Sequence, residues 1–473
     1  MARSILRLAP MFLALTACID PVDTRPAGLP LSDETPTRLA QAPAVALPPM
    51  KVFSRVLPLA PTRSNSDIAQ DFLDLSFKLE SGRALPVFTR FEAPIEVVVS
   101  GKPAPGMITD LRAVMRRLRQ EAGIDINFGK ASLNGSAKGQ ALVTVQAVSS
   151  AEIRRYLPQA ACFVVPGITS LSQYHEARRA GLTDWARLGK REKIAIFVPN
   201  DVAPQEARDC LHEELAQALG PLNDLYRLPD STFNDDNMHT VLTGFDMLVL
   251  KATYAPELRS GMSREEVARV LPGLLARLNP QGDGELNRRL PETTPEWIND
   301  ITAALGPGRS EGARVAAAQN ALRVAQSEGW QDHRLGFSHF VLARMLQRKD
   351  RAEAFKHMTA AYTIFRRRPE TATHAAHAAA QLAAHALREG KGDLALSLLN
   401  GQDDVARQSE NAALLASIQM LRAEALEMTG RDSDAQTVRL DSLGWARYGF
   451  GPDWAVRAKL DEIAALRPDA IRG

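Results

Sequence analysis

The sequence predicts two folded parts: an α+β domain, in which helices pack on a mixed sheet, and an all-α domain of repeated helices. Between residues 65 and 280, short runs rich in valine and isoleucine alternate with amphipathic stretches at helical spacing. From Ser263 the strand pattern ends, and after residue 308 alanine-rich stretches at helical spacing follow. With 473 residues, the chain is long enough for two or three domains.

The N-terminus has the pattern of an export signal. Arg3 and Arg7 form a short basic region, and residues 8–15 are apolar except for Pro10. This run is shorter than the roughly 20 residues of a membrane-spanning helix, but it suits the apolar part of a signal peptide. We therefore expect residues 1–17 to be removed.

The residues at the cleavage point resemble the lipobox of bacterial lipoproteins. Small residues, Thr16 and Ala17, precede Cys18. The resemblance implies that Cys18 is lipidated, and Ile19 after it implies an outer-membrane lipoprotein that faces the periplasm. The alternative is ordinary secretion with a free Cys18 thiol. No later stretch is apolar enough to span a bilayer, so the acyl chains are the one membrane anchor that we expect.

A tether is expected over residues 18–64. Prolines recur along this stretch and no hydrophobic period is sustained. Such a composition buries too little apolar surface to offset the entropy of ordering the chain. We expect it to be disordered and to hold the folded part away from the membrane.

The α+β domain is expected over residues 65–280. Its helices are predicted at 68–79, 108–122, a short segment from Ala151, and 204 to about 219. Its strands are predicted at 95–99, 124–128, 141–148, 162–165 and 194–198. Ser263, with Glu266 three residues later, is a capping box that begins a helix running to about Leu278.

Residues 281–308 are expected to form a linker, and residues 309–473 a helical domain. Gly390 and Gly430 stand 40 residues apart in turns that are followed by helical stretches. This repeat resembles a tetratricopeptide array, although the usual period is about 34 residues. A plain helical bundle is the alternative. His374, His377 and His385 are expected to be packed or solvated rather than to act as ligands.

Two cysteines remain after lipidation of Cys18, namely Cys162 and Cys210. An even number in an oxidising compartment favours a disulfide between them. Two buried free thiols are the alternative. The 57 basic and 55 acidic residues nearly balance, so nothing in the net charge indicates a nucleic-acid partner.

The densest group of polar residues lies at the end of the helix predicted over 204–219. His212-Glu213 suggests a His-Glu-x-x-His zinc motif, but Ala216 occupies the position of the second histidine. At about 100° per residue, Glu213, Gln217 and Gly220 share one face, and His212 points about 140° away from Gln217.

In this frame the spacing resembles the zinc helix of metzincin peptidases, with every histidine replaced. Glu214 takes the position of the catalytic glutamate, and the ligand positions hold Glu213, Gln217 and Asn223. The segment 230–235 lies where that superfamily has a methionine-bearing turn, with Phe233 in the methionine's place. A helix through 243–254 is expected to close the domain.

A closer resemblance is to the bacterial family called domain of unknown function 2927. It rests on the run 210–224, the turn 231–235 and the stretch 242–262. The resemblance covers roughly residues 65 to 280 and implies no established activity.

A zinc peptidase needs three ligands and an open water position, and it needs Glu214 as its base. Gln217 and Asn223 offer neutral amide oxygens, which suit hard cations better than zinc. We therefore expect neither a metal nor another cofactor, and we assign Glu214 a catalytic role only if the protein is an active enzyme. The candidate polar site comprises Glu213, Gln217, Asn223, Asp224, Asn234 and Asp235.

Three functional interpretations stay open. The favoured one is a degenerate metallopeptidase-like domain that binds peptides or proteins of the cell envelope in the periplasm. The second is an active peptidase on envelope proteins with an atypical metal site or a metal-independent mechanism. In the third, the polar residues are a solvated helix face and a satisfied loop.

Overall fold

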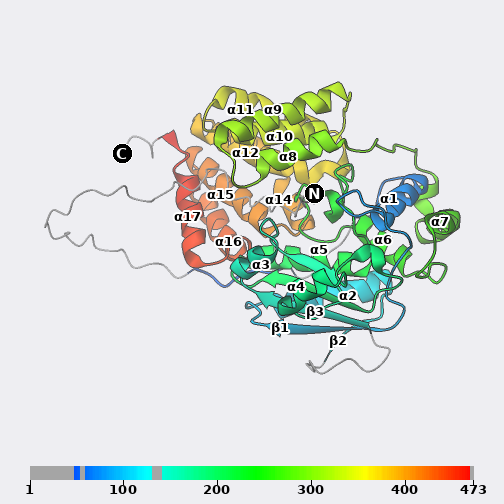
Figure 1. Ribbon diagram of the computed structural model, residues 1–473. Helices are drawn as coiled ribbons and strands as arrows, with labels where there is room; N and C mark the ends of the chain where they lie inside the picture. Colours follow the sequence, from blue (N-terminus) through cyan, green and yellow to red (C-terminus); the bar gives the residue numbers. More distant parts are fainter. Residues whose placement is uncertain (1–46, 54–58, 130–140, 469–473) are drawn as a thin grey trace.

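The computed structural model describes residues 47–53, 59–129 and 141–468, which form an α+β half and a helical half (Figure 1). The predicted signal peptide and Cys18 lie outside the described residues. Within those residues, no helix is both long enough and apolar enough to cross a bilayer. The predicted fold class, a mixed sheet with helices followed by a mostly helical region, is confirmed.

The sheet of the first half has five strands in the order β2-β1-β3-β5-β4. They are β1 (Ile95–Gly101), β2 (Ile126–Phe128), β3 (Ala141–Val148), β4 (Phe163–Pro166) and β5 (Lys193–Pro199). Neighbouring strands are parallel except for β4, which pairs antiparallel with β5 and leaves its other edge outside the sheet. The register places Val97 beside Val143, and Val145 beside Ile196.

Helices cover both faces of this sheet. On one face lie α1 (Asn65–Phe77), α2 (Met107–Ala122), α5 (Pro204–Leu219), α6 (Gly244–Thr253) and α7 (Arg264–Leu278). On the other lie α3 (Ser150–Tyr156) and α4 (Tyr174–Arg179). The alternation along β5 explains the two cores, because Ile194 and Ile196 face the first set of helices while Ala195 and Phe197 face the second.

The helical half is built from consecutive helices packed in pairs. Its elements are α8 (Pro295–Leu305), α9 (Glu311–Ser327), α10 (His333–Leu346), α11 (Arg351–Phe365), α12 (Ala372–Arg388), α13 (Gly392–Leu399), α14 (Gln402–Gln408), α15 (Ala412–Met428), α16 (Asp432–Phe450) and α17 (Asp453–Ala464). Gly390 and Gly430 have the same role in successive pairs: each adopts a positive φ, 71° and 74°, just after a long helix ends.

Two stretches expected to lack packed structure contribute to this half. Helix α8 falls inside the expected linker 281–308, and its Trp297 and Ile301 are buried in the core with α9 and α10. Residues 47–53, inside the expected tether, lie along α16. There Phe53 stacks on Trp445 and the amide of Lys51 donates to the carbonyl of Gly444.

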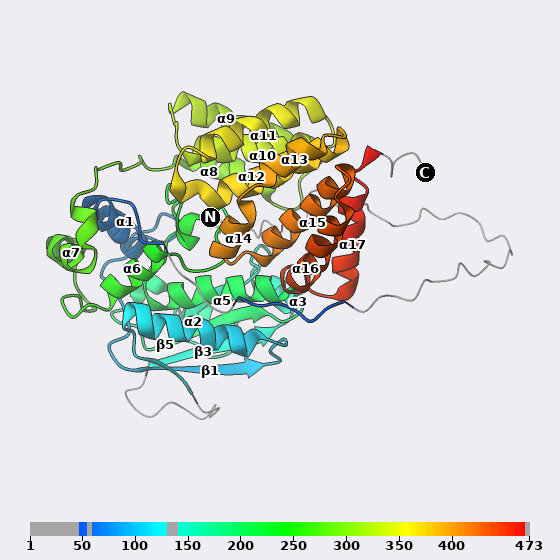
Figure 2. The same cartoon turned by 180° about the vertical axis from the view of Figure 1, so that it is seen from behind.

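The two halves meet along α5, which lies between the sheet and the helical half (Figure 2). The buried guanidinium of Arg208 donates to the carbonyl oxygen of Glu410, at 2.6 Å. Gln205 exchanges side-chain and main-chain hydrogen bonds with Asn411 and Ala413 at the start of α15. Because these contacts are buried, the helix that carries the candidate site is fixed by both halves.

Candidate functional site

The helix α5 is positioned by the strand before it and by a disulfide. Pro204 stands at its first turn, where a missing amide hydrogen costs nothing. Cys210, in its middle, is bonded to Cys162 just before β4, and both cysteines are fully buried. The predicted disulfide is therefore present, and it ties the site helix to the edge strand of the sheet.

The C-terminus of α5 is held by a buried arginine from the segment before β5. Arg191 donates from Nη1 to the carbonyl of Gln217, at 2.6 Å, and from Nη2 to the carbonyl of Gly220. The hydroxyl of Tyr254 donates to the carbonyl of Leu219. Carbonyls that a helix end leaves unpaired are thereby satisfied. Burial lowers the pKa of Arg191 to about 10, so it stays charged near neutral pH.

Gly220, the residue after the last turn of α5, does not have a positive φ. Its φ is −161°, outside the left-handed region that favours glycine. What favours glycine is space, because a Cβ here would lie 3.2 Å from both Cγ2 and Oγ1 of Thr253.

His212 faces away from the candidate site, as the helical spacing predicted. It is buried, and its Nδ1 accepts a hydrogen bond from the amide of Leu242 at 3.2 Å. Burial, followed by the charges of Arg208 and Arg117, holds the pKa of His212 well below its usual range. The imidazole is therefore a neutral structural group.

The loop after α5 is pinned to the rest of the domain by its polar side chains. Asn223 donates from Nδ2 to the carbonyl of Asp74 on α1, and Asn234 donates from Nδ2 to the carbonyl of Leu228. Both asparagines are buried. Two members of the predicted polar site thus hold the loop in place, and Gln217 is also buried.

Asp246, near the start of α6, fixes the turn expected at 230–235. Its carboxylate accepts hydrogen bonds from the hydroxyl of Ser231 and from the amide and hydroxyl of Thr232. It also completes a capping box with Thr243. Phe233, at the centre of the turn, is fully buried in the core of this half.

The remaining predicted residues belong to a cluster of carboxyl groups at the end of α5. Its members are Glu80, Glu213, Glu214, Asp224 and Asp235. Glu80 follows α1 and is exposed at the rim, while Glu214 is only 2% exposed. Three elements distant in the sequence therefore bring acidic groups to one place.

These carboxyl groups raise one another's pKa. Burial and the charge of Asp224 raise the pKa of Glu214 to about 8. Burial also raises the pKa of Asp224, to about 7, although a hydrogen bond with Glu80 opposes the shift. The pKa of Glu213 and Asp235 lies well above the usual range, first through burial and then through neighbouring carboxylates. The cluster thus holds protons near neutral pH.

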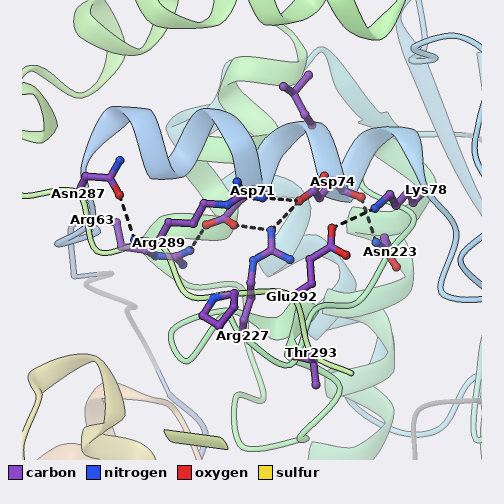
Figure 3. Close-up of polar contacts among 12 residues, drawn as sticks. Arg63, Asp71, Asp74, Lys78, Asn223, Arg227, Asn287, Arg289, Glu292 and Thr293 are labelled. Carbon is purple, nitrogen blue, oxygen red and sulfur yellow. Dashed lines mark hydrogen bonds and ion pairs between the residues drawn. The ribbon is translucent and has the colours of Figure 1, made fainter. Parts of the chain in front are cut away.

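Beside this cluster, an ion-pair network joins α1 to the site loop (Figure 3). Arg227 is buried and donates from Nη2 to Asp71 at 2.7 Å and to Asp74 at 2.8 Å. Arg63 reaches Asp71 from the other side, and Arg264 reaches Asp74. A buried arginine between two carboxylates is strongly held, because removing one partner leaves an uncompensated charge.

A cavity of about 100 Å³ lies between this network and the acidic cluster. Its lining residues are Asp74, Lys78, Asp224, Leu225, Tyr226, Arg227, Glu292, Thr293 and Ile298. Figure 3 shows Lys78, Arg227 and Glu292 in this region below α1. The cavity thus has charged groups beside an apolar wall.

The far side of the same loop packs against the helical half. Tyr226 makes an edge-on contact with Trp297 of α8, with ring centroids 4.9 Å apart, and its carbonyl accepts a hydrogen bond from Nε2 of His333. Asp236 pairs with His374 of α12. His374 and His377 are buried, as expected for packed residues, but the contact of His374 with Asp236 was not predicted.

The residues at the metzincin zinc-ligand positions do not fit a zinc ion. Glu213 is the one carboxylate among them, and the side-chain amide of Asn223 is engaged by the main chain of α1. In the part of the chain that the structure describes, no group of three or more His, Cys, Asp or Glu side chains is arranged to hold a metal ion. A base of the metzincin class acts on a water bound to zinc, and these three positions offer such a metal one carboxylate and two neutral amides.

Sequence reasoning found four of the five clustered carboxyls and missed Glu80. Nothing in the sequence around residue 80 marks it, because its importance comes from the contact between the C-terminal end of α1 and the loop after α5. Tyr226, whose hydroxyl donates to Asp235, was missed for the same reason.

Comparison with known families bears on this half of the chain. Residues 65–273 match the model of a family described as protein of unknown function (DUF2927). The match runs from the start of α1 into α7 and includes every carboxyl of the cluster. No curated protein matches the chain. The expected resemblance to this family is thus confirmed for these residues, and the family description names no activity.

Proposed function

We propose that this protein is a lipoprotein of the bacterial cell envelope whose α+β half binds peptides or proteins without cleaving them. The observation that carries the proposal is the carboxyl cluster at the end of α5, where Glu214 is buried with an unpaired oxygen, Oε2. Folding alone does not favour such a group, because burying an unpaired acceptor costs free energy. A ligand that donates hydrogen bonds would remove this cost.

The edge of the sheet supports a peptide as the ligand. Strand β4 is an edge strand next to α5, and the disulfide fixes it there. The outer edge of such a strand presents main-chain donors and acceptors that an extended peptide can pair with. An edge strand beside the helix that carries Glu213 and Glu214 suits a chain that runs along the strand and places a side chain in the cluster.

We also propose that the α+β half is related in fold to the metzincin peptidases. This relation is supported by the site helix that follows β5, the pinned turn around Phe233 and the closing helix α6. The replaced histidines favour a domain that has kept the shape of a peptidase and lost its zinc chemistry.

The helical half favours a protein partner in the envelope. Its helices pack in consecutive pairs, in keeping with a tetratricopeptide-like array. Stacked helix pairs form extended surfaces that bind other proteins. We propose that this half contributes a second binding surface.

Attachment through Cys18 places this activity at the outer membrane, facing the periplasm. We expect Cys18→Ser to move the protein from the membrane fraction to the soluble periplasmic fraction, because lipid is the one proposed anchor. Cell fractionation followed by immunoblotting measures this. A variant that stays with the outer membrane after a salt wash would argue against the anchor.

A metal-independent hydrolase is a second candidate, and the pKa of two carboxyl groups favours it. The pKa of Glu214 is about 8 and that of Asp224 is about 7. The charge of Asp224 contributes to the raised pKa of Glu214. Carboxyl groups that share protons near neutral pH can act as a general acid and a general base.

One experiment separates the two candidates. A pool of peptides prepared from envelope proteins is incubated with the purified protein, and both retained and newly cleaved peptides are identified by mass spectrometry, with zinc measured by elemental analysis. Binding predicts retained, intact peptides. Cleavage that is lost in Glu214→Gln favours the hydrolase. If no peptide is retained and none is cleaved, the proposal is overturned.

A further inference from the structure

We propose that the carboxyl cluster binds an organic cation, the ammonium or guanidinium group of a basic peptide ligand. This inference rests on the proposed peptide binding and adds the chemistry of the ligand. Five acidic groups, Glu80, Glu213, Glu214, Asp224 and Asp235, meet at the end of α5, and two buried carboxyl oxygens among them have no hydrogen-bond partner.

The unpaired oxygens show where the cation would bind. They are Oε2 of Glu214 and Oδ1 of Asp224, each shielded from solvent. Glu214 is 2% exposed, and Asp224 is the neighbour whose charge acts on it most strongly. Two unpaired acceptors from different elements, close enough to repel each other, form a natural site for one donor group with a positive charge.

The basic residues nearest the cluster are already neutralised by other carboxylates. Lys78 pairs with Glu292 at 3.3 Å, and Arg227 pairs with Asp71 and Asp74. Both line the cavity beside Asp224, and their ion pairs run to carboxylates outside the cluster. The excess negative charge of the cluster is therefore left for a ligand.

The cavity fits the rest of a lysine or arginine side chain. Leu225 and Ile298 provide apolar surface along it, and Asp224 lies at the cluster side. Long basic side chains pack their methylene groups on apolar surface while the charged end meets acidic groups. Tyr226 adds an aromatic wall, next to which a cation is also stabilised.

An organic cation suits the cluster better than a metal ion. Calcium requires six or more oxygens at about 2.3–2.6 Å around one point. No set of described carboxyl and histidine side chains meets the requirement for a metal ion. Hydrogen bonds from an ammonium or guanidinium group are longer, at about 2.7–2.9 Å, and reach acceptors that are spread apart.

Binding of a cation should release protons. The cluster itself consists of Glu213 and Glu214 from α5, Glu80 after α1, and Asp224 and Asp235 from the loop. The other titratable or charged groups around it are Lys78 after α1, Tyr226 and Arg227 of the loop, and Asp246 of α6 behind Asp224. The carboxyl groups hold protons in the free protein, and a cation would displace them. Affinity for a basic peptide should therefore rise between about pH 6 and pH 8.

The test uses isothermal titration calorimetry with capped pentapeptides that differ only in their central residue: lysine, arginine, acetyl-lysine or glutamate. A fifth, neutral peptide with a free N-terminus distinguishes a terminal amine from a side chain. We expect the cationic peptides to bind at least about tenfold more tightly than acetyl-lysine, with proton release that differs between buffers of different ionisation enthalpy.

Glu213→Gln and Asp224→Asn should each weaken this preference about tenfold. Glu206→Gln removes the same charge from the first turn of α5, outside the cluster, and should leave the preference unchanged. Circular dichroism of each variant checks that the fold is retained.

Equal binding of lysine and acetyl-lysine peptides would overturn the inference while leaving peptide binding intact. Tight binding of calcium alone that both cluster variants abolish would make the site a metal site and overturn it as well. If the envelope pool is retained without enrichment in lysine and arginine, the inference fails but the proposed function stands. If no peptide of the pool is retained, the proposed function itself fails.

Discussion

Nε2 of His374 lies 2.6 Å from Oδ2 of Asp236, and both side chains are buried. This pair joins α12 of the helical half to the loop that carries the candidate site. Burial alone would raise the pKa of Asp236, but the charge and hydrogen bond of His374 hold it below its usual value. The carboxylate is therefore charged at neutral pH and depends on its partner in the other half.

His374→Ala should accordingly destabilise the protein more than an ordinary surface substitution. It leaves the buried carboxylate of Asp236 with the amide of Met238 on Oδ1 but without its partner on Oδ2. Removing one partner of a buried pair costs about 3–5 kcal/mol. Urea unfolding of wild type, His374→Ala, Asp236→Asn and the double variant gives the coupling free energy. His385→Ala, on the same helix but half-buried, is the control. If the double variant loses as much unfolding free energy as the two single variants together, the pair is not coupled.

The disulfide between Cys162 and Cys210 should stabilise the α+β half appreciably. It closes a loop with a sequence separation of 48 residues. On the loop-entropy model this corresponds to about 4 kcal/mol of unfolding free energy. Replacing both cysteines by serine should lower the urea midpoint accordingly. In a Cys18→Ser background, thiol titration of denatured, unreduced protein should detect no free thiol, and detection of two would contradict the bond.

Elements bounded by strong local signals were predicted well. Strand β3 and helix α5 have the bounds that the sequence suggested, Ala141–Val148 and Pro204–Leu219. An apolar run marks the first, while a proline at the start and a glycine after the end mark the second. These signals act within a few residues, so a single sequence contains them.

Features that depend on tertiary contacts were not predicted. The proline-rich stretch 47–53 has the composition of a disordered tether, yet Phe53 finds a stacking partner in Trp445. Likewise, Glu80 joins the cluster because α1 packs near the end of α5. Gly220 shows the same limit, since its role is set by its distance to Thr253 on α6 and not by its own backbone.

Substitution of Gly220 should be costly through crowding. A Cβ at this position would approach Thr253 to 3.2 Å, and Thr253 is fully buried. We expect Gly220→Ala to destabilise by about 1 kcal/mol and Gly220→Val by up to about 3 kcal/mol, as for overpacked cores. Thermal unfolding measures both changes. Because Thr253→Ser removes Cγ2, it should partly restore Gly220→Ala; no restoration would place the cost in the backbone instead.

Glu214 should make the protein less stable as the pH rises. Its pKa is about 8 in the folded protein and near 4.5 when the chain is unfolded. Between these values the folded state binds more protons than the unfolded state, so the free energy of unfolding falls with increasing pH. The contribution is fully present below about pH 4.5 and is lost by about pH 8.

Glu214→Gln should therefore flatten this dependence. Glutamine keeps the shape and cannot ionise, so the variant should match wild type near pH 5 and exceed it by a few kcal/mol near pH 8.5. Part of the slope should persist, because the pKa of Asp224 is also raised, to about 7. Urea unfolding from pH 5 to 9 measures the effect, with the exposed Glu176→Gln on α4 as control. If wild type and Glu214→Gln lose stability in parallel up to pH 9, Glu214 is already ionised at neutral pH, and the cluster has a bound positive charge or solvent that offsets its repulsion.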